Sequence, residues 1–224
     1  PIDYLISSTG ASVSTFPQSR LLRAVTMTSD EVQESVATLL ELALDFMIQD
    51  PVPNNHCFAW HANGQPNPDF ERRLALYDAH QRPLVLPLND PTPATQLLAI
   101  SSAHAGERLQ RTLQTRLPKL TVIRTTSPLD HHSTWLEIFP GNVSKSKSAC
   151  WLCGELNLDT RQTVTIGNDY NDIDLLEWGA CSYVVGNAPG DLRNQFTPVS
   201  SHDDNGFTQA VNRWLVRSSD SLPR

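Results

Sequence analysis

Apolar positions along the chain switch between a strand-like and a helical spacing. Short apolar runs predict strands within residues 4–11, 57–60, 96–101, 120–125, 133–139, 164–167 and 183–186. Apolar residues three or four positions apart predict helices at 69–80, 103–116, 150–156 and 173–178 and after 207. A further helix is expected to begin near Ser29 and to keep its apolar spacing through Phe46, before a proline-containing break at 50–55. From Pro140 onward, helices and strands alternate as in a doubly wound α/β fold.

Polar side chains gather where one of these strands ends. Val164 and Ile166 predict a buried strand that stops at Gly167, and a helix with apolar positions follows from Ile173. Between them lie Asn168, Asp169, Asn171 and Asp172. Ligands bind at the carboxyl ends of strands in open α/β sheets, and amide and carboxylate oxygens suit a hard cation such as Mg²⁺. The loop is therefore a candidate metal site.

Two structural alternatives compete with a metal site. Asn and Asp are favoured N-cap residues, and acids near a helix N-terminus are stabilised by its dipole, so the loop could simply begin a helix. A calcium loop of the EF-hand type is excluded, because Ile173 falls on a ligand position and the required glycine is absent.

Lys145 makes the loop more specific. The order Val143-Ser144-Lys145, helix, strand, Gly-Asn-Asp-Tyr-Asn-Asp at 167–172 and Gly-Asn-Ala-Pro at 186–189 resembles the C-terminal half of haloacid dehalogenase-like phosphatases. The resemblance is to the Cof-type branch, which carries a large α/β cap. It is strong from Ser133 to Leu215 and includes the segment 203–207 before the last helix.

The resemblance implies a fold and its division. The fold class is α/β: a haloacid dehalogenase-like, Rossmann-like core with a parallel sheet, whose N-terminal unit is missing here, plus an α/β cap domain. Residues 1–14 are expected to be a core strand leading into the cap, residues 15–139 the cap, and residues 140–224 the C-terminal half of the core. A rival alignment would make Ser8-Thr9-Gly10 a phosphate-binding motif; we prefer the alignment in which this turn enters the cap.

Two departures from the family pattern stand out. The family's reaction uses a strand that ends in Asp-x-Asp-Gly-Thr, whose first Asp attacks phosphorus. No such motif occurs here, so the nucleophile is expected to lie outside this sequence, in a segment that precedes it. In addition, Asn168 stands where the family has a metal-binding Asp, which leaves open whether Asn168 or Asp169 is the ligand.

The resemblance also implies an activity: a Mg²⁺-dependent phosphatase that hydrolyses small phosphorylated metabolites, especially sugar phosphates. Lys145 would be catalytic and bind phosphate, Asn171 would orient phosphate, and Asn168, Asp169 and Asp172 would be the metal ligands. Two alternatives remain. One is a phosphomutase or phosphotransferase of the same superfamily, and the other is a non-catalytic phosphate-binding or regulatory protein with a degenerate phosphatase fold.

The charge and composition of the chain limit the classes of partner that the sequence supports. With 17 basic and 24 acidic residues the net charge is −7. The sequence has no basic stripe of the kind that binds nucleic acid, so nucleic acid is not an expected partner. No apolar run is long enough to span a membrane. Four scattered cysteines fit a reducing cytoplasm, and the Cys150/Cys153 pair is expected to pack in the core rather than bind zinc. His131 and His132 are expected to lie in a loop without a metal. The oligomeric state is left open.

Overall fold

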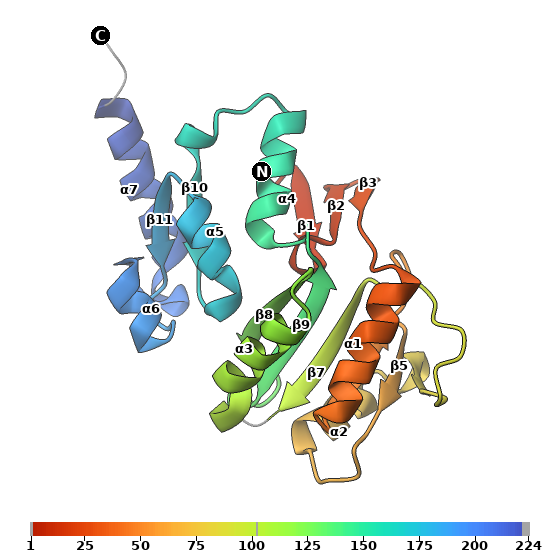
Figure 1. The fold of residues 1–224 in the computed structure, drawn as a ribbon. Coiled ribbons are helices and arrows are strands. Elements are labelled where there is room, and N and C mark those ends of the chain that lie inside the picture. The colour runs from red at the N-terminus through yellow and green to blue at the C-terminus, as the bar shows by residue number, and fades with distance from the viewer. Residues whose placement is uncertain (1, 102, 221–224) are drawn as a thin grey trace. The chain divides into compact units, whose positions relative to one another are not determined.

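The computed structural model describes residues 2–101 and 103–220. The chain divides into two compact units, Pro1–Val143 and Ser144–Arg224. Among the described residues, the first unit contains a three-stranded antiparallel sheet and a six-stranded mixed sheet, and the second contains a three-stranded parallel sheet (Figure 1).

A six-stranded sheet forms most of unit 1. Its strand order is β6-β5-β4-β7-β9-β8. The strands are β4 (Asp45–Gln49), β5 (Phe58–His61), β6 (Gln81–Pro83), β7 (Gln96–Ser101), β8 (Leu120–Thr126) and β9 (Thr134–Pro140). All neighbours are antiparallel except β5 and β6, which run parallel.

The central strands are apolar on both faces, which explains their unbroken hydrophobic runs. Side chains alternate between the faces of a strand. In β4, Phe46 and Ile48 join one core cluster and Met47 joins another. The same division separates Leu97 from Leu98 in β7. Both faces of this sheet are therefore covered.

Helices supply the covering layers of unit 1. Helices α1 (Ser29–Glu41) and α3 (Gly106–Arg116) pack on the face that contains Phe46. Helix α2 (Pro68–Leu76) packs on the opposite face through Phe70, which is fully buried against Met47 and Phe58. Figure 1 shows α1 and α3 on the same face of the sheet.

The prediction of a helix from Ser29 to Phe46 is correct at its start and wrong at its end. The helix ends at Glu41, and residues 45–49 form β4. Ala43 has a left-handed backbone with φ of 51°, which breaks the helix although its spacing continues into the next residues. Residues 45–49 then pair on both sides, with β5 and with β7, and all five are buried.

A small antiparallel sheet begins the chain. It consists of β1 (Tyr4–Ser7), β2 (Ser12–Thr15) and β3 (Leu21–Ala24), and the short 3-10 turn η1 (Ser8–Gly10) joins the first two. The turn is anchored on the large sheet of the same unit, because Thr9 Oγ1 donates to Glu137 Oε2 at 2.9 Å. Asn55 Nδ2 likewise donates to Ser8 Oγ at 2.9 Å. The predicted strand and tight turn at 4–11 are confirmed.

Unit 2 is a parallel α/β layer. Strands β10 (Val164–Gly167), β11 (Cys181–Val184) and β12 (Thr197–Pro198) lie in that order and run parallel. The helices are α4 (Lys145–Glu155), α5 (Ile173–Trp178), α6 (Gly190–Gln195) and α7 (Gly206–Asp220). Ala210 of α7 packs on one side of the sheet with Tyr183, and Leu192 of α6 packs on the other with Val184. The predicted α/β class and parallel sheet are confirmed.

Two predictions about side chains can be compared with the structure. The core position expected for the Cys150/Cys153 pair is wrong for Cys150, which is exposed on α4, while Cys153 is half-buried. Cys150 points outward because the buried position in this part of α4 is Ser148. The loop predicted around His131 and His132 is confirmed, since these residues lie in a turn between β8 and β9. No helix in the described ranges is both long and apolar enough to cross a bilayer.

Candidate functional site

Lys145 and the loop 167–172 come together in unit 2. Lys145 is the first residue of α4, and Ser144 caps this helix by accepting a hydrogen bond from the Lys147 N–H at 3.2 Å. The loop follows β10 and contains the 3-10 turn η5 (Tyr170–Asp172) before α5. Lys145 Nζ donates to Asp172 Oδ1 at 2.5 Å, so the two segments that the sequence singled out meet through an ion pair.

Asp172 holds the loop in shape. Its side chain is only 8% exposed, whereas that of Lys145 is 26% exposed. While Oδ1 accepts from Lys145, Oδ2 accepts from the backbone N–H of Asn168 at 2.7 Å and from that of Asp169 at 3.3 Å. A buried carboxylate is tolerated when its oxygens are satisfied in this way. The carboxylate therefore closes the loop onto itself and fixes the position of the lysine.

Gly167 is required by the same packing. A Cβ atom placed on Gly167 would lie 2.6 Å from Asp172 Cβ and 3.0 Å from Leu176 Cδ1. These distances are shorter than van der Waals contact, so Asp172 can approach the end of β10 only because residue 167 has no side chain.

Asp169 and Asp174 have capping contacts. Asp169 is the N-cap of η5 and forms a capping box with Asp172, and its Oδ1 accepts from the Tyr170 N–H at 2.8 Å. Asp174 Oδ2 accepts from the Ser146 N–H at 3.1 Å, which ties α5 to the first turn of α4. The structural alternative, that acids in this loop begin a helix, is thus correct for Asp169, whose carboxylate accepts from the Tyr170 N–H and, in the capping box, from the Asp172 N–H.

Charge in the site is unbalanced. The loop and the first turn of α5 carry three carboxylates, those of Asp169, Asp172 and Asp174, and Lys145 pairs with that of Asp172. Such an excess of negative charge favours a divalent cation, and phosphate would need that cation to approach.

The donor atoms fit Mg²⁺ in kind. Asn168, Asp169 and Asp172 offer only oxygen, which this hard ion prefers. Asn168 is exposed, and its side-chain amide makes no hydrogen bond within the described residues. Both Asp172 oxygens already accept hydrogen bonds, so Asp172 is better suited to order the loop or to bind through water. Asn171 is half-buried beside these residues in η5.

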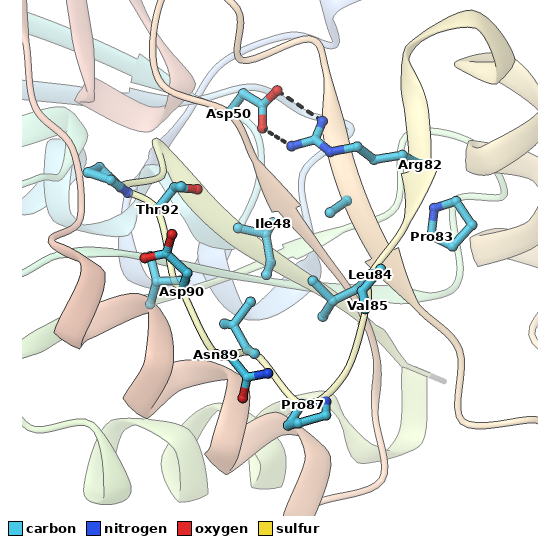
Figure 2. A pocket seen from close by; sticks show the side chains of 14 residues that line it. Ile48, Asp50, Arg82, Pro83, Leu84, Val85, Pro87, Asn89, Asp90 and Thr92 are labelled. Carbon is cyan, nitrogen blue, oxygen red and sulfur yellow. Dashed lines mark hydrogen bonds and ion pairs between the residues drawn. The ribbon is translucent and has the colours of Figure 1, made fainter.

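Unit 1 contains a separate hollow of about 430 Å³ between β5, α1 and the segment 83–93. Figure 2 shows Asp50 facing Arg82 at this hollow. Arg82 donates to both carboxylate oxygens of Asp50, at 2.6 and 3.0 Å, and this pairing raises the pKa of Arg82. Since the pair neutralises itself and most other lining residues are aliphatic or proline, the hollow lacks the chemistry of the loop in unit 2.

Sequence reasoning missed several contacts. The pattern indicated Lys145 and Asp172 but not their direct pairing, and it did not single out Asp174 or the use of Asp172 as a double acceptor for backbone N–H groups. A group formed by His56, Cys57 and His80 in unit 1 was also missed. A signal for Asp174 was its place one turn after the loop, at the beginning of an apolar helix.

Known proteins share both the sequence pattern and the fold. The family model of haloacid dehalogenase-like hydrolases matches residues 2–211. A "Putative phosphatase" of Streptococcus pyogenes serotype M6 is 26% identical over 156 residues, which are 65% of this chain and 55% of that protein. A "Putative phosphatase" of Haemophilus influenzae is 21% identical over 151 residues, which are 66% of this chain and 52% of that protein. The chain thus spans about half the length of these curated relatives.

A solved structure agrees in fold. The structure of BT4131, which is described as a sugar phosphatase of subclass IIB, superposes with a TM-score of 0.71 and 15% identity. The match covers 95% of this chain and 76% of that one. At this identity the likeness establishes the fold, and the family model covers most of the chain. The chain belongs to the haloacid dehalogenase-like hydrolase family.

Proposed function

We propose that this chain is part of a Mg²⁺-dependent phosphatase that hydrolyses small phosphorylated metabolites, with sugar phosphates as the favoured class. The observation that carries the proposal is the 2.5 Å ion pair between Lys145 and Asp172 at the carboxyl end of β10. Its support is the family membership and the fold shared with a sugar phosphatase.

Lys145 would stabilise negative charge on the transferring phosphoryl group. Phosphoryl transfer asks a protein mainly for positioning and for neutralisation of charge. Asp172 holds the ammonium in place, and about a quarter of the lysine side chain remains accessible to a ligand. The amide of Asn171 would donate to a phosphate oxygen and fix its orientation.

Mg²⁺ would be held by Asn168 or Asp169, with Asp172 acting directly or through water. The ion would supply positive charge to the phosphate oxygens as the bond to phosphorus breaks. The amide of Asn168 brings no charge, so the charge available to the ion from this loop is that of Asp169 and Asp172.

The carboxylate nucleophile of the proposed reaction would be an Asp outside this sequence, which contains no Asp-x-Asp-Gly-Thr motif. The unit with the six-stranded sheet would act as the cap that selects the leaving group, with residues 15–139 as its extent and residues 140–224 as part of the core.

A non-catalytic role has one observation in its favour: Asn168 stands where the family has an Asp. A phosphatase releases inorganic phosphate, a phosphotransferase moves the phosphate to an acceptor, and a phosphate-binding protein leaves the ester intact. The test incubates the natural protein that contains this chain with a panel of sugar phosphates, with Mg²⁺ or with a chelator, and measures inorganic phosphate and transfer to an added sugar.

Release of inorganic phosphate that requires Mg²⁺ is the expected result. Phosphate found mainly on the acceptor sugar would favour a phosphotransferase. Binding of phosphate esters without turnover would favour the regulatory role and contradict the proposed hydrolysis.

A further inference from the structure

Three side chains of the types that bind metals lie together in unit 1, where the parallel strands β5 and β6 begin. His56 and Cys57 immediately precede β5, and His80 is the last residue of the 3-10 turn η2 (Asp78–His80), immediately before β6. Phe58 pairs with Gln81 in the parallel register of β5 and β6. Cys57 and His80 are therefore neighbours because of strand pairing, although 23 positions separate them in the sequence.

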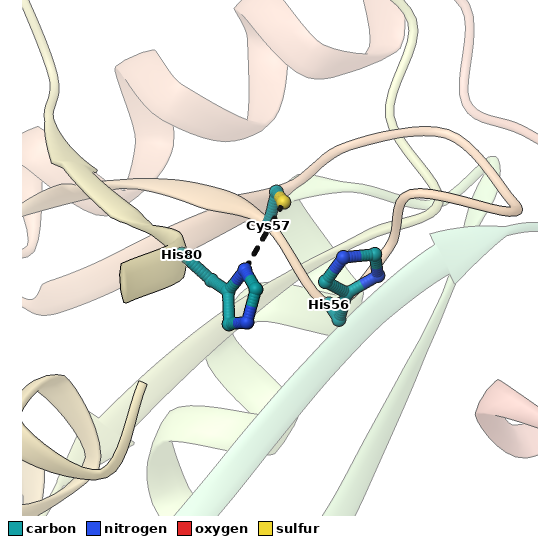
Figure 3. A group of neighbouring side chains, drawn as sticks. All are labelled: His56, Cys57 and His80. Carbon is teal, nitrogen blue, oxygen red and sulfur yellow. Dashed lines mark hydrogen bonds between the residues drawn. The ribbon is translucent and has the colours of Figure 1, made fainter. Parts of the chain in front are cut away.

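The side chains converge as well as the backbones. Cys57 Sγ lies 3.8 Å from His80 Nδ1. The rings of His56 and His80 meet edge to face, with centroids 4.8 Å apart. One potential ligand atom from each of the three residues lies within 4.8 Å of the other two, and Figure 3 shows the sulfur and the two rings gathered at one place.

We propose that His56, Cys57 and His80 form a binding site for a thiophilic divalent transition metal of the Zn²⁺ class. Two imidazoles and one thiolate are the nitrogen and sulfur ligands that such ions prefer. Bonds of about 2.0–2.3 Å in a tetrahedral site place ligand atoms roughly 3.3–3.8 Å apart. Cys57 and His80 already have this separation.

Only His56 has to move for the site to close. The ligand atoms of the group are at most 4.8 Å apart. A side-chain rotation that moves the ligating nitrogen of the exposed His56 ring by about 1 Å therefore suffices. His56 and His80 are exposed and Cys57 is half-buried, which lets an ion reach the site from solvent. Three protein ligands leave a fourth position for water or an external ligand.

Nearby charge does not oppose the site strongly. Arg82 follows the first residue of β6, and its guanidinium is already paired with Asp50. Arg73, which lines a hollow together with His56, lies over the rings of Tyr77 and Trp135. The thiolate of Cys57 would also neutralise one of the two positive charges of a bound divalent ion. The proposed ligands are softer than the oxygens of the loop 167–172, so the two sites would select different metals.

The alternative is a purely structural cluster. A weak thiol–imidazole hydrogen bond and an edge-to-face ring contact would give the same geometry without a metal. These contacts need no thiolate and give no response to added metal, which a spectroscopic probe can detect.

The test titrates Co²⁺, as a probe for Zn²⁺, into the full chain after treatment with a chelator. A bound thiolate gives a sulfur-to-cobalt charge-transfer band, which oxygen ligands cannot produce, and added Zn²⁺ should remove it. The variant Cys57→Ser should lose the band. His80→Gln and His56→Gln should each weaken binding by about tenfold or more. Both histidines are exposed, so these variants test the site even if Cys57→Ser folds poorly.

Cys150→Ser and His132→Gln are matched controls, because they change an exposed cysteine and a loop histidine outside the group. Both should keep the band and the affinity for Co²⁺. The proposal is overturned if no band forms, if the band survives Cys57→Ser, if neither histidine variant weakens binding, or if Cys150→Ser removes the band.

Discussion

At the scale of single residues, the site depends on how closely Asp172 approaches the end of β10. The carboxylate reaches Lys145 and two backbone N–H groups at once, and the Asp172 side chain lies where a Cβ atom on residue 167 would collide with it. The geometry of this loop therefore rests on a residue without a side chain.

Gly167→Ala should destabilise the protein, since the new methyl group would lie 2.6 Å from Asp172 Cβ. The expected loss is about 1–3 kcal/mol in the free energy of unfolding, typical of overpacking in a closed site. Denaturant unfolding measures it. The matched control is Gly154→Ala on α4, where nothing apart from the adjacent residues and the backbone of the helix itself lies within 4 Å of the added methyl group.

The control should be neutral or stabilising by up to about 1 kcal/mol, because alanine is the better helix former. Equal stabilities of the two variants would contradict the packing described for Asp172.

Residues of this site were predictable in part. Lys145 and the loop 167–172 each stand in a short local sequence pattern. The resemblance to a phosphatase family predicted that the two belong to one site. The hydrogen bonds of Asp172 and the tie between Asp174 and Ser146 depend on how α4 and α5 meet in space. No spacing within one segment encodes such a contact.

At the scale of elements, local signals fixed where helices begin better than where they end. Helix α1 starts as expected, with a capping box at Thr28. Its Oγ1 accepts from the Glu31 N–H at 3.3 Å, and Glu31 Oε2 accepts from the Thr28 N–H at 2.7 Å. The end at Glu41 was missed, because Leu44, Phe46, Met47 and Ile48 could be the apolar positions of a helix or of a central strand. Only pairing with β5 and β7 decides between the two.

Thr28→Ala should destabilise unit 1 by about 1 kcal/mol, since it leaves the Glu31 N–H without its cap. Thermal or denaturant unfolding checks this value. Ser29→Ala, one position later, should change stability by less than about 0.5 kcal/mol. A control variant that loses as much stability as Thr28→Ala would show that the capping box is not the cause.

Pairing between distant elements also hid the group of His56, Cys57 and His80. The histidines and the cysteine precede two strands that are separated by α2, and only the parallel register of β5 and β6 brings them together. The sequence offered no more than isolated residues of metal-binding type.

At the scale of the whole molecule, the chain combines a mixed six-stranded unit with a parallel α/β unit. The α/β class was predictable because helical and strand-like spacings alternate along the chain, and the family model agrees over residues 2–211. The proposed phosphate chemistry belongs to unit 2, and the proposed transition-metal site belongs to unit 1. Each unit thus carries a candidate site with its own donor chemistry.

The central claim is that Lys145 and the loop it contacts form a phosphatase site. The most direct measurement is kcat for Mg²⁺-dependent hydrolysis of a sugar phosphate by the natural protein that contains this chain, compared with Lys145→Ala and with Lys147→Ala. Lys147 is exposed on the same helical turn and serves as the control. Loss of the ammonium should lower kcat by about 100- to 1,000-fold, as for removal of a group that stabilises transition-state charge.

The control variant should retain kcat within a few fold, and both variants should keep their fold by circular dichroism. Full turnover in Lys145→Ala, or an equal loss in both variants, would contradict the assignment of this site.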